Sequence, residues 1–123
     1  MKRRTYSLSP EGCPVEVAFD AVGGKYKGMF LYHLLDGPKR FGELRKLKPT
    51  VTQRTMTLHL RELEEVGVVH RQVYAVVPPR VEYSLTPLGR TLEPILRLML
   101  AWGVEHMGEV ERAIKAAVAE EQT

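Results

Sequence analysis

Residues 52–66 read TQRTMTLHLRELEEV, and the apolar residues in this stretch recur with the period of a helix. Met56, Leu60 and Leu63 fall three or four positions apart, which places them on one face at about 100° per residue. Thr52 is one of the residue types preferred at a helix N-cap. The stretch therefore predicts a helix over 52–66 with one side facing a core and a polar side turned away from it.

After Gly67, where this helix is expected to stop, the pattern changes to that of strands. Residues 68–74 and 81–85 read VVHRQVY and VEYSL, and both are rich in β-branched and aromatic side chains. Pro78-Pro79 lies between them and indicates a loop. The two segments therefore predict an antiparallel hairpin that follows the long helix directly.

Three shorter helical patterns precede the long helix. The first covers residues 13–22, the second covers about 25–36 and is apolar on most sides, and the third covers 41–47. The resulting order is helix, helix, short helix, long helix and hairpin, which is the order of a winged helix-turn-helix. We therefore expect a mainly α fold with a small two-stranded wing.

A last helix is predicted from Thr86-Pro87, a good cap followed by a proline suited to the first helical position, to about Ala119. Pro94 lies inside the pattern and should kink it. The apolar stripe of this helix consists of Leu88, Leu92, Ile95, Leu96, Met99, Trp102, Gly103, Met107, Val110, Ile114 and Ala117. A helix of this length is too long for so small a domain to cover, so we expect a homodimer formed through it.

The chain has 123 residues, enough for one ordinary domain, and 44% of them are hydrophobic, as in folded proteins. We divide it into a loose arm (1–12), a DNA-binding region (13–85) and a dimerisation helix with an acidic tail (86–123). No apolar stretch is long enough to span a membrane, and the basic start lacks the apolar run of a signal peptide. The single cysteine fits a reducing compartment, so we expect a cytoplasmic protein without membrane contact.

Charge is distributed unevenly along the chain, whose net charge is +3. Residues 39–61 hold seven cations against one acid, a net of +6, and residues 105–123 hold five acids against two cations, a net of −3. Such a basic segment is either a surface that faces a polyanion or an ordinary solvated face.

Six stretches of the chain, in this order, resemble the HxlR-type family of winged-helix regulators over about residues 12–103. They are CPVE (13–16), GGKYK (23–27), LLDGPKRFGEL (34–44), LRELE (60–64), VPPRVEYSLTPLG (77–89) and AWG (101–103). The resemblance implies a dimeric transcription factor that binds double-stranded DNA. It also implies that a cysteine at the position of Cys13 senses oxidants or electrophiles in some members.

In a winged helix the long helix 52–66 would read DNA in the major groove. With Met56, Leu60 and Leu63 in the core, the base-contacting candidates are Gln53, Arg54, Thr57 and Leu58. Arginine can bind guanine through two hydrogen bonds, glutamine can do the same with adenine, and a leucine can contact the thymine methyl group. Arg61 could reach a phosphate or pair with a neighbouring acid (Glu62, Glu64 or Glu65). Without the resemblance, the same pattern would fit an ordinary charged surface helix.

Cations next to the short helix are candidates for contacts with phosphates, which provide affinity but no sequence choice. They are Lys39, Arg40, Arg45, Lys46 and Lys48. Arg80, behind the two prolines of the hairpin loop, could enter the minor groove, where narrow A·T tracts attract arginine. Alternatively, Arg80 could pair with Glu82.

Cys13 stands at the start of the first helix, where the positive end of the helix dipole favours the reactive thiolate form. It is therefore a candidate redox sensor. Against this, cysteine is often buried, and Glu16 would oppose a thiolate.

The histidines lack cysteine or carboxylate partners at metal-like spacing, and no phosphate loop or nucleophile motif is present, so we expect no metal, no cofactor and no enzyme. Trp102 and Met107 are more typical of a core or dimer interface than of a ligand pocket. We therefore expect a homodimeric, sequence-specific regulator, a repressor at an inverted-repeat operator. The alternative is a winged helix used only as a protein-interaction module.

Overall fold

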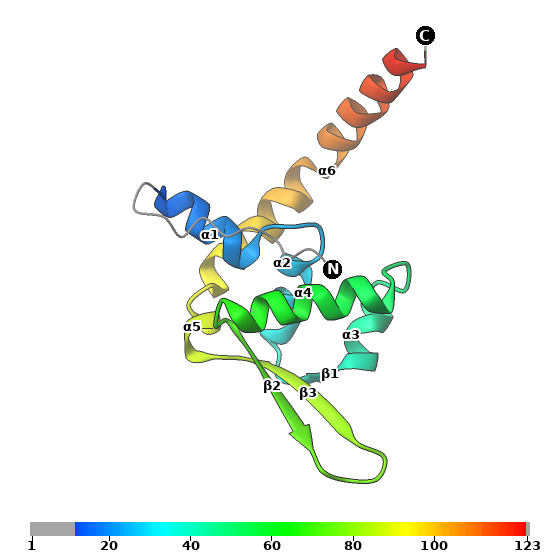
Figure 1. Ribbon diagram of the computed structural model, residues 1–123. Coiled ribbons are helices and arrows are strands. Elements are labelled where there is room, and N and C mark those ends of the chain that lie inside the picture. Colours follow the sequence, from blue (N-terminus) through cyan, green and yellow to red (C-terminus); the bar gives the residue numbers. More distant parts are fainter. Residues whose placement is uncertain (1–11, 123) are drawn as a thin grey trace. The chain divides into compact units, whose positions relative to one another are not determined.

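The computed structural model describes residues 12–122 (Figure 1). This part of the chain forms six helices and three strands. They are α1 (Pro14–Val22), α2 (Lys27–Leu34), β1 (Lys39–Arg40), α3 (Phe41–Leu47), α4 (Gln53–Glu65), β2 (Val69–Tyr74), β3 (Arg80–Leu85), α5 (Pro87–Arg90) and α6 (Glu93–Glu121). The predicted order of helices and hairpin is confirmed, and the fold is a winged helix-turn-helix.

The sheet has one more strand than the sequence predicted. β2 and β3 form the expected hairpin, which extends beyond the helices in Figure 1. The two residues of β1 also pair antiparallel with β3, so the strand order is β1-β3-β2. A two-residue strand has no hydrophobic period to detect, because its place in the sheet comes from pairing with a distant segment.

The core lies among α2, α3, α4 and the first residues of the hairpin. Phe30, Leu34, Leu44, Met56 and Leu63 are all fully buried. The core face predicted for residues 52–66 is therefore confirmed.

Both ends of α4 follow the expected local chemistry. The Thr52 hydroxyl oxygen accepts a hydrogen bond from the backbone N–H of Thr55 at 3.1 Å, which satisfies one of the free donors at the helix start. Beyond the last turn, Gly67 adopts a φ of 84°, a left-handed conformation that disfavours residues with a Cβ. α4 is thus held at both ends.

The predicted single helix beginning at residue 86 with a kink at Pro94 is wrong. Thr86 caps a separate short helix, α5, by accepting a hydrogen bond from the backbone N–H of Gly89 at 3.0 Å. Residues 91 and 92 form a turn, and Pro94 is the second residue of α6. A proline costs no hydrogen bond in the first turn of a helix, because the N–H groups of that turn have no acceptor within the helix. Pro94 therefore fits a helix start and not a kink.

The chain divides after Glu93 into two compact units, the second of which contains nearly all of α6. Within residues 12–122, no helix is long and apolar enough to cross a membrane. α6 nevertheless exposes many large apolar side chains: Ile95, Leu98, Met99, Leu100, Trp102, Val104, Met107, Val110, Ile114 and Val118.

Candidate DNA-binding surface

α4 presents a polar side opposite its buried side. Gln53, Arg54 and Arg61 are exposed, and Thr57 and Leu58 are half-buried. Because Arg54, Leu58 and Arg61 are four and three residues apart, they follow one another along the same side of the helix. The five candidates on α4 thus lie on the accessible part of the helix.

Thr57 has part of its hydrogen-bonding capacity already in use. Its hydroxyl group donates a 2.8 Å hydrogen bond to the backbone carbonyl of Gln53, one turn earlier. The hydroxyl oxygen keeps lone pairs that can accept. Thr57 is therefore suited to accept from an amino group of a base rather than to donate to one.

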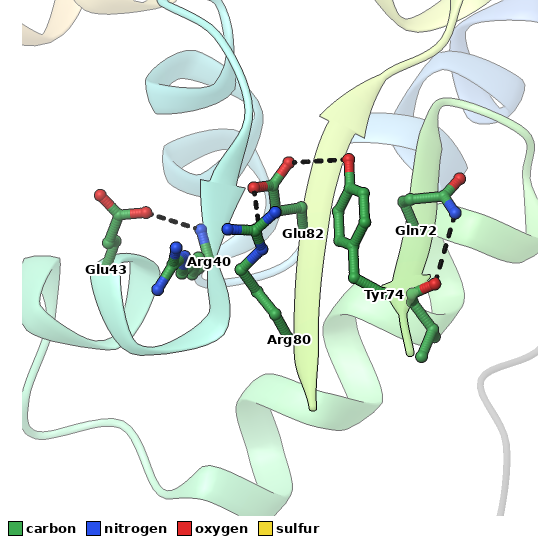
Figure 2. Close-up of polar contacts among 7 residues, drawn as sticks. Arg40, Glu43, Gln72, Tyr74, Arg80 and Glu82 are labelled. Atoms are coloured by element: carbon green, nitrogen blue, oxygen red, sulfur yellow. Dashed lines mark hydrogen bonds and ion pairs between the residues drawn. The ribbon is translucent and has the colours of Figure 1, made fainter. Parts of the chain in front are cut away.

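The cations near α3 differ in their exposure. Arg40, Lys46 and Lys48 are exposed, whereas Lys39 and Arg45 are half-buried. The backbone N–H of Arg40 donates a 2.8 Å hydrogen bond to a carboxylate oxygen of Glu43, which anchors the start of α3 (Figure 2). Arg40 also belongs to β1, so the short helix is tied to the sheet.

Arg80 contacts two neighbours on the hairpin, and Figure 2 shows its ion pair with Glu82. Its Nε lies 3.7 Å from a carboxylate oxygen of Glu82, and its guanidinium carbon lies 4.5 Å from the centre of the Tyr74 ring. The pairing with Glu82, one of the two alternatives for Arg80, is therefore present in this structure. The side chain remains 38% exposed, so a DNA contact by Arg80 stays a prediction.

A cleft of about 480 Å³ separates the start of α3 from the tip of the hairpin. Arg40, Phe41 and Gly42 line one side, and residues 76–81 line the other. Val77 at the tip is fully exposed. The cleft thus places Arg40 and Arg80, from two separate elements, on its walls.

A buried ion pair between α2 and α4 was not predicted. Lys27 Nζ lies 3.2 Å from a carboxylate oxygen of Glu62, and both side chains are at most 5% exposed. The signal in the sequence was a lysine inside a helix that is apolar on most sides, because such a charge needs a buried partner. This pair links α4 to α2.

Arg61 has fewer candidate partners than the sequence suggested. Glu62 pairs with Lys27, and Glu64 lies 3.4 Å from Nε of Arg71 on β2. Burial raises the pKa of the Tyr83 hydroxyl group above its usual 10.0; the charge of Arg71 opposes this rise, that of Glu64 adds to it, and that of Arg61 opposes it.

Cys13 is exposed and is the N-cap residue of α1. Its backbone carbonyl accepts hydrogen bonds from the N–H groups of Glu16 at 2.8 Å and Val17 at 3.2 Å. Val15 and Phe19 on the same short helix expose about 60% of their surface. The thiol therefore lies at an accessible helix start next to an uncovered apolar surface.

Comparisons with known proteins agree with this geometry. The HxlR-like helix-turn-helix family matches residues 21–111. The HTH-type transcriptional regulator YdeP of Bacillus subtilis (strain 168) is 56% identical over 112 residues, which cover 91% of this chain and 88% of YdeP.

Two solved structures are also similar. The redox regulator HypR in its oxidized form is 59% identical, with a TM-score of 0.73 over 76% of this chain and 96% of that one. Diamide-treated YodB from B. subtilis is 37% identical, with a TM-score of 0.64 over 76% of this chain and 93% of that one.

Proposed function

Since the chain belongs to the HxlR-like helix-turn-helix family and is a transcriptional regulator of the helix-turn-helix type, we propose that it binds a specific operator as a homodimer and represses transcription. The operator is an inverted repeat, because a two-fold dimer presents two identical reading helices. α4 enters the major groove, and the hairpin approaches the adjacent minor groove. Lys39, Arg40, Arg45, Lys46 and Lys48 contribute contacts with phosphates.

The observation that carries this proposal is the two-sided character of α4. Its apolar side is fully buried at Met56 and Leu63, while Gln53, Arg54 and Arg61 are exposed. A reading helix needs this combination, since the core must fix the helix while its donors reach the base edges.

Selection from a pool of random duplex DNA tests the proposal. We expect an inverted repeat whose half-sites are centred about one helical turn, 10–10.5 base pairs, or a multiple of it apart. Affinity should fall steeply with salt, as it does when phosphates are contacted. A chain that enriches no sequence and does not bind heparin would instead be a protein-interaction module.

We further propose that oxidation of Cys13 alters operator binding. The support is the exposed thiol at the start of α1 and the similarity to a redox regulator and to a protein studied after diamide treatment. In a reaction with diamide, two thiols lose two electrons and two protons, which the diamide takes up, and one disulfide forms. With one cysteine per chain, the second thiol belongs to the partner subunit or to a small thiol.

Diamide treatment followed by operator titration tests the role of Cys13. We expect the wild type to change its affinity and the Cys13→Ser variant to keep it. Non-reducing electrophoresis distinguishes a disulfide between subunits from one with a small thiol, because only the first doubles the chain mass. A bridge between subunits requires Cα atoms within about 7 Å. Oxidised wild type that binds the operator as tightly as reduced wild type would remove Cys13 from the regulation.

A further inference from the structure

One face of the three-stranded sheet brings together five polar side chains from three strands. Glu82 on β3 is paired in register with Arg40 of β1 on one side and with Gln72 of β2 on the other. Arg80 is two residues before Glu82 and therefore points to the same face, and its cross-strand partner is Tyr74. Glu82 thus lies directly across from Arg40 on this face of the sheet, with Arg80 as its neighbour along the same strand.

The Glu82 carboxylate contacts two of these neighbours at once (Figure 2). One oxygen lies 3.5 Å from the hydroxyl group of Tyr74, which donates to it, and the other lies 3.7 Å from Nε of Arg80. The Tyr74 ring in turn lies against the guanidinium group at 4.5 Å. Tyr74, Arg80 and Glu82 therefore form a closed cluster, in which each side chain contacts the other two.

We propose that Glu82 and Tyr74 are positioning residues that fix the guanidinium group of Arg80 on the hairpin, so that Arg80 discriminates between DNA grooves by their width. This inference rests on the proposed DNA-binding function and concerns the selectivity of the hairpin. Its ligand is the narrow minor groove of an A·T-rich duplex.

Two opposite effects follow from a carboxylate at this position. Glu82 repels the DNA backbone and partly neutralises Arg80, so it lowers affinity for every sequence. It also limits the rotamers of a long side chain that otherwise loses much of its rotamer entropy when it binds. A fixed arginine favours a groove of one width, whereas a mobile arginine adapts to many.

An ordinary surface ion pair predicts something different. Exposed pairs contribute little to stability, and a carboxylate that only neutralises charge would change the affinity for all sequences by the same factor. The two interpretations are therefore distinguished by the ratio of the affinities for an A·T and a G·C duplex, and not by either affinity alone.

The experiment measures this ratio with two duplexes that share the selected half-sites and carry either A·T or G·C pairs where the hairpin reaches the minor groove. For Glu82→Gln we expect several-fold tighter binding to both duplexes. The ratio of the affinity for the A·T duplex to the affinity for the G·C duplex should fall by about threefold or more. Tyr74→Phe removes only the hydroxyl group and should lower the ratio less. In Arg80→Ala the ratio should fall to that of the double variant Arg80→Ala/Glu82→Gln, because the two residues act as one unit.

Glu64→Gln is the matched control, since Glu64 also pairs with an arginine of the hairpin, Arg71 at 3.4 Å. It should leave the ratio unchanged. A ratio in Glu82→Gln equal to that of the wild type would overturn the inference. If Glu82→Gln loses its cooperative thermal unfolding, the affinity ratio of Tyr74→Phe is used instead, and a ratio equal to that of the wild type would overturn the inference. A wild type that binds no DNA would overturn the proposed function as well, whereas normal binding with an unchanged ratio removes this inference alone.

Discussion

α4 and α6 differ in the kinds of side chain that they leave exposed. In α4 the apolar side is buried, with Met56 and Leu63 fully inaccessible, and the polar side is open. In α6 large apolar side chains are exposed as well as polar ones, with Trp102 59% and Val104 68% exposed. One helix offers hydrogen-bond donors on a rigid support, and the other offers apolar surface.

The difference teaches which kind of partner each helix suits. Exposed donors and cations on a fixed helix suit a charged, hydrogen-bonding polymer such as DNA. A long row of exposed apolar residues suits another protein surface, because contact between such surfaces removes both from water. Of the four predictions below, which begin with the largest expected effect on DNA binding, the first three concern these two helices.

Breaking the apolar surface of α6 should have the largest effect on DNA binding. Trp102→Glu would place a charge in the proposed dimer interface, where an unpaired buried charge costs several kcal/mol. We expect sedimentation to show the 14.0 kDa chain in place of a species of about twice that mass. Operator affinity should fall by about 100-fold or more, since the second reading helix no longer belongs to the same molecule.

Lys115→Glu is the control for this variant, because it changes charge at an exposed polar position of the same helix. It should remain dimeric and bind the operator. A monomeric Trp102→Glu with wild-type operator affinity would show that α6 is not needed for DNA binding.

Two ion pairs of α4 should contribute very differently to stability. Glu62→Ala removes the carboxylate that lies 3.2 Å from Lys27 Nζ, and losing one partner of a buried ion pair costs about 3–5 kcal/mol. Glu64→Ala removes an exposed pair with Arg71 and should cost at most about 1 kcal/mol. Urea unfolding of both variants measures the difference, and equal costs would mean that the Lys27–Glu62 pair does not anchor α4.

Arg54 and Lys46 should separate base reading from phosphate contact. Arg54→Ala is expected to cost about 1–3 kcal/mol at one base pair of each half-site and to relax the preference there. Lys46→Ala should weaken all sequences equally and reduce the salt slope by about one. Both are measured by titration of operator variants at several salt concentrations. An unchanged preference in Arg54→Ala would mean that another side of α4 faces the bases.

The smallest effect concerns Tyr83 and the stability of the winged helix at high pH. Burial raises the pKa of the Tyr83 hydroxyl above 10.0 in the folded chain. The folded state therefore keeps a proton that the unfolded state loses, so stability is full below pH 10 and declines as pH rises above it. Tyr83→Phe should unfold with a shallower pH dependence in this range, and an identical dependence would mean that Tyr83 titrates alike in both states.

Much of this protein follows from its sequence alone. The period of Met56, Leu60 and Leu63 predicted the buried side of α4 and the exposure of Arg54 and Arg61, because a helix maps spacing directly onto direction. The change of period after Gly67 predicted the hairpin. These features depend on neighbours within about four residues, so no distant contact was needed to find them.

Other features arise only when distant segments meet. β1 is a strand because it pairs with β3, more than forty positions further along the chain. The burial of Lys27 depends on Glu62 from another helix, and the setting of Arg80 depends on Tyr74 from the neighbouring strand. Pro94 begins a helix rather than kinking one, because the turn at residues 91 and 92 separates it from α5. Periodicity reports which way a side chain points, but the partner that it meets depends on how the elements pack.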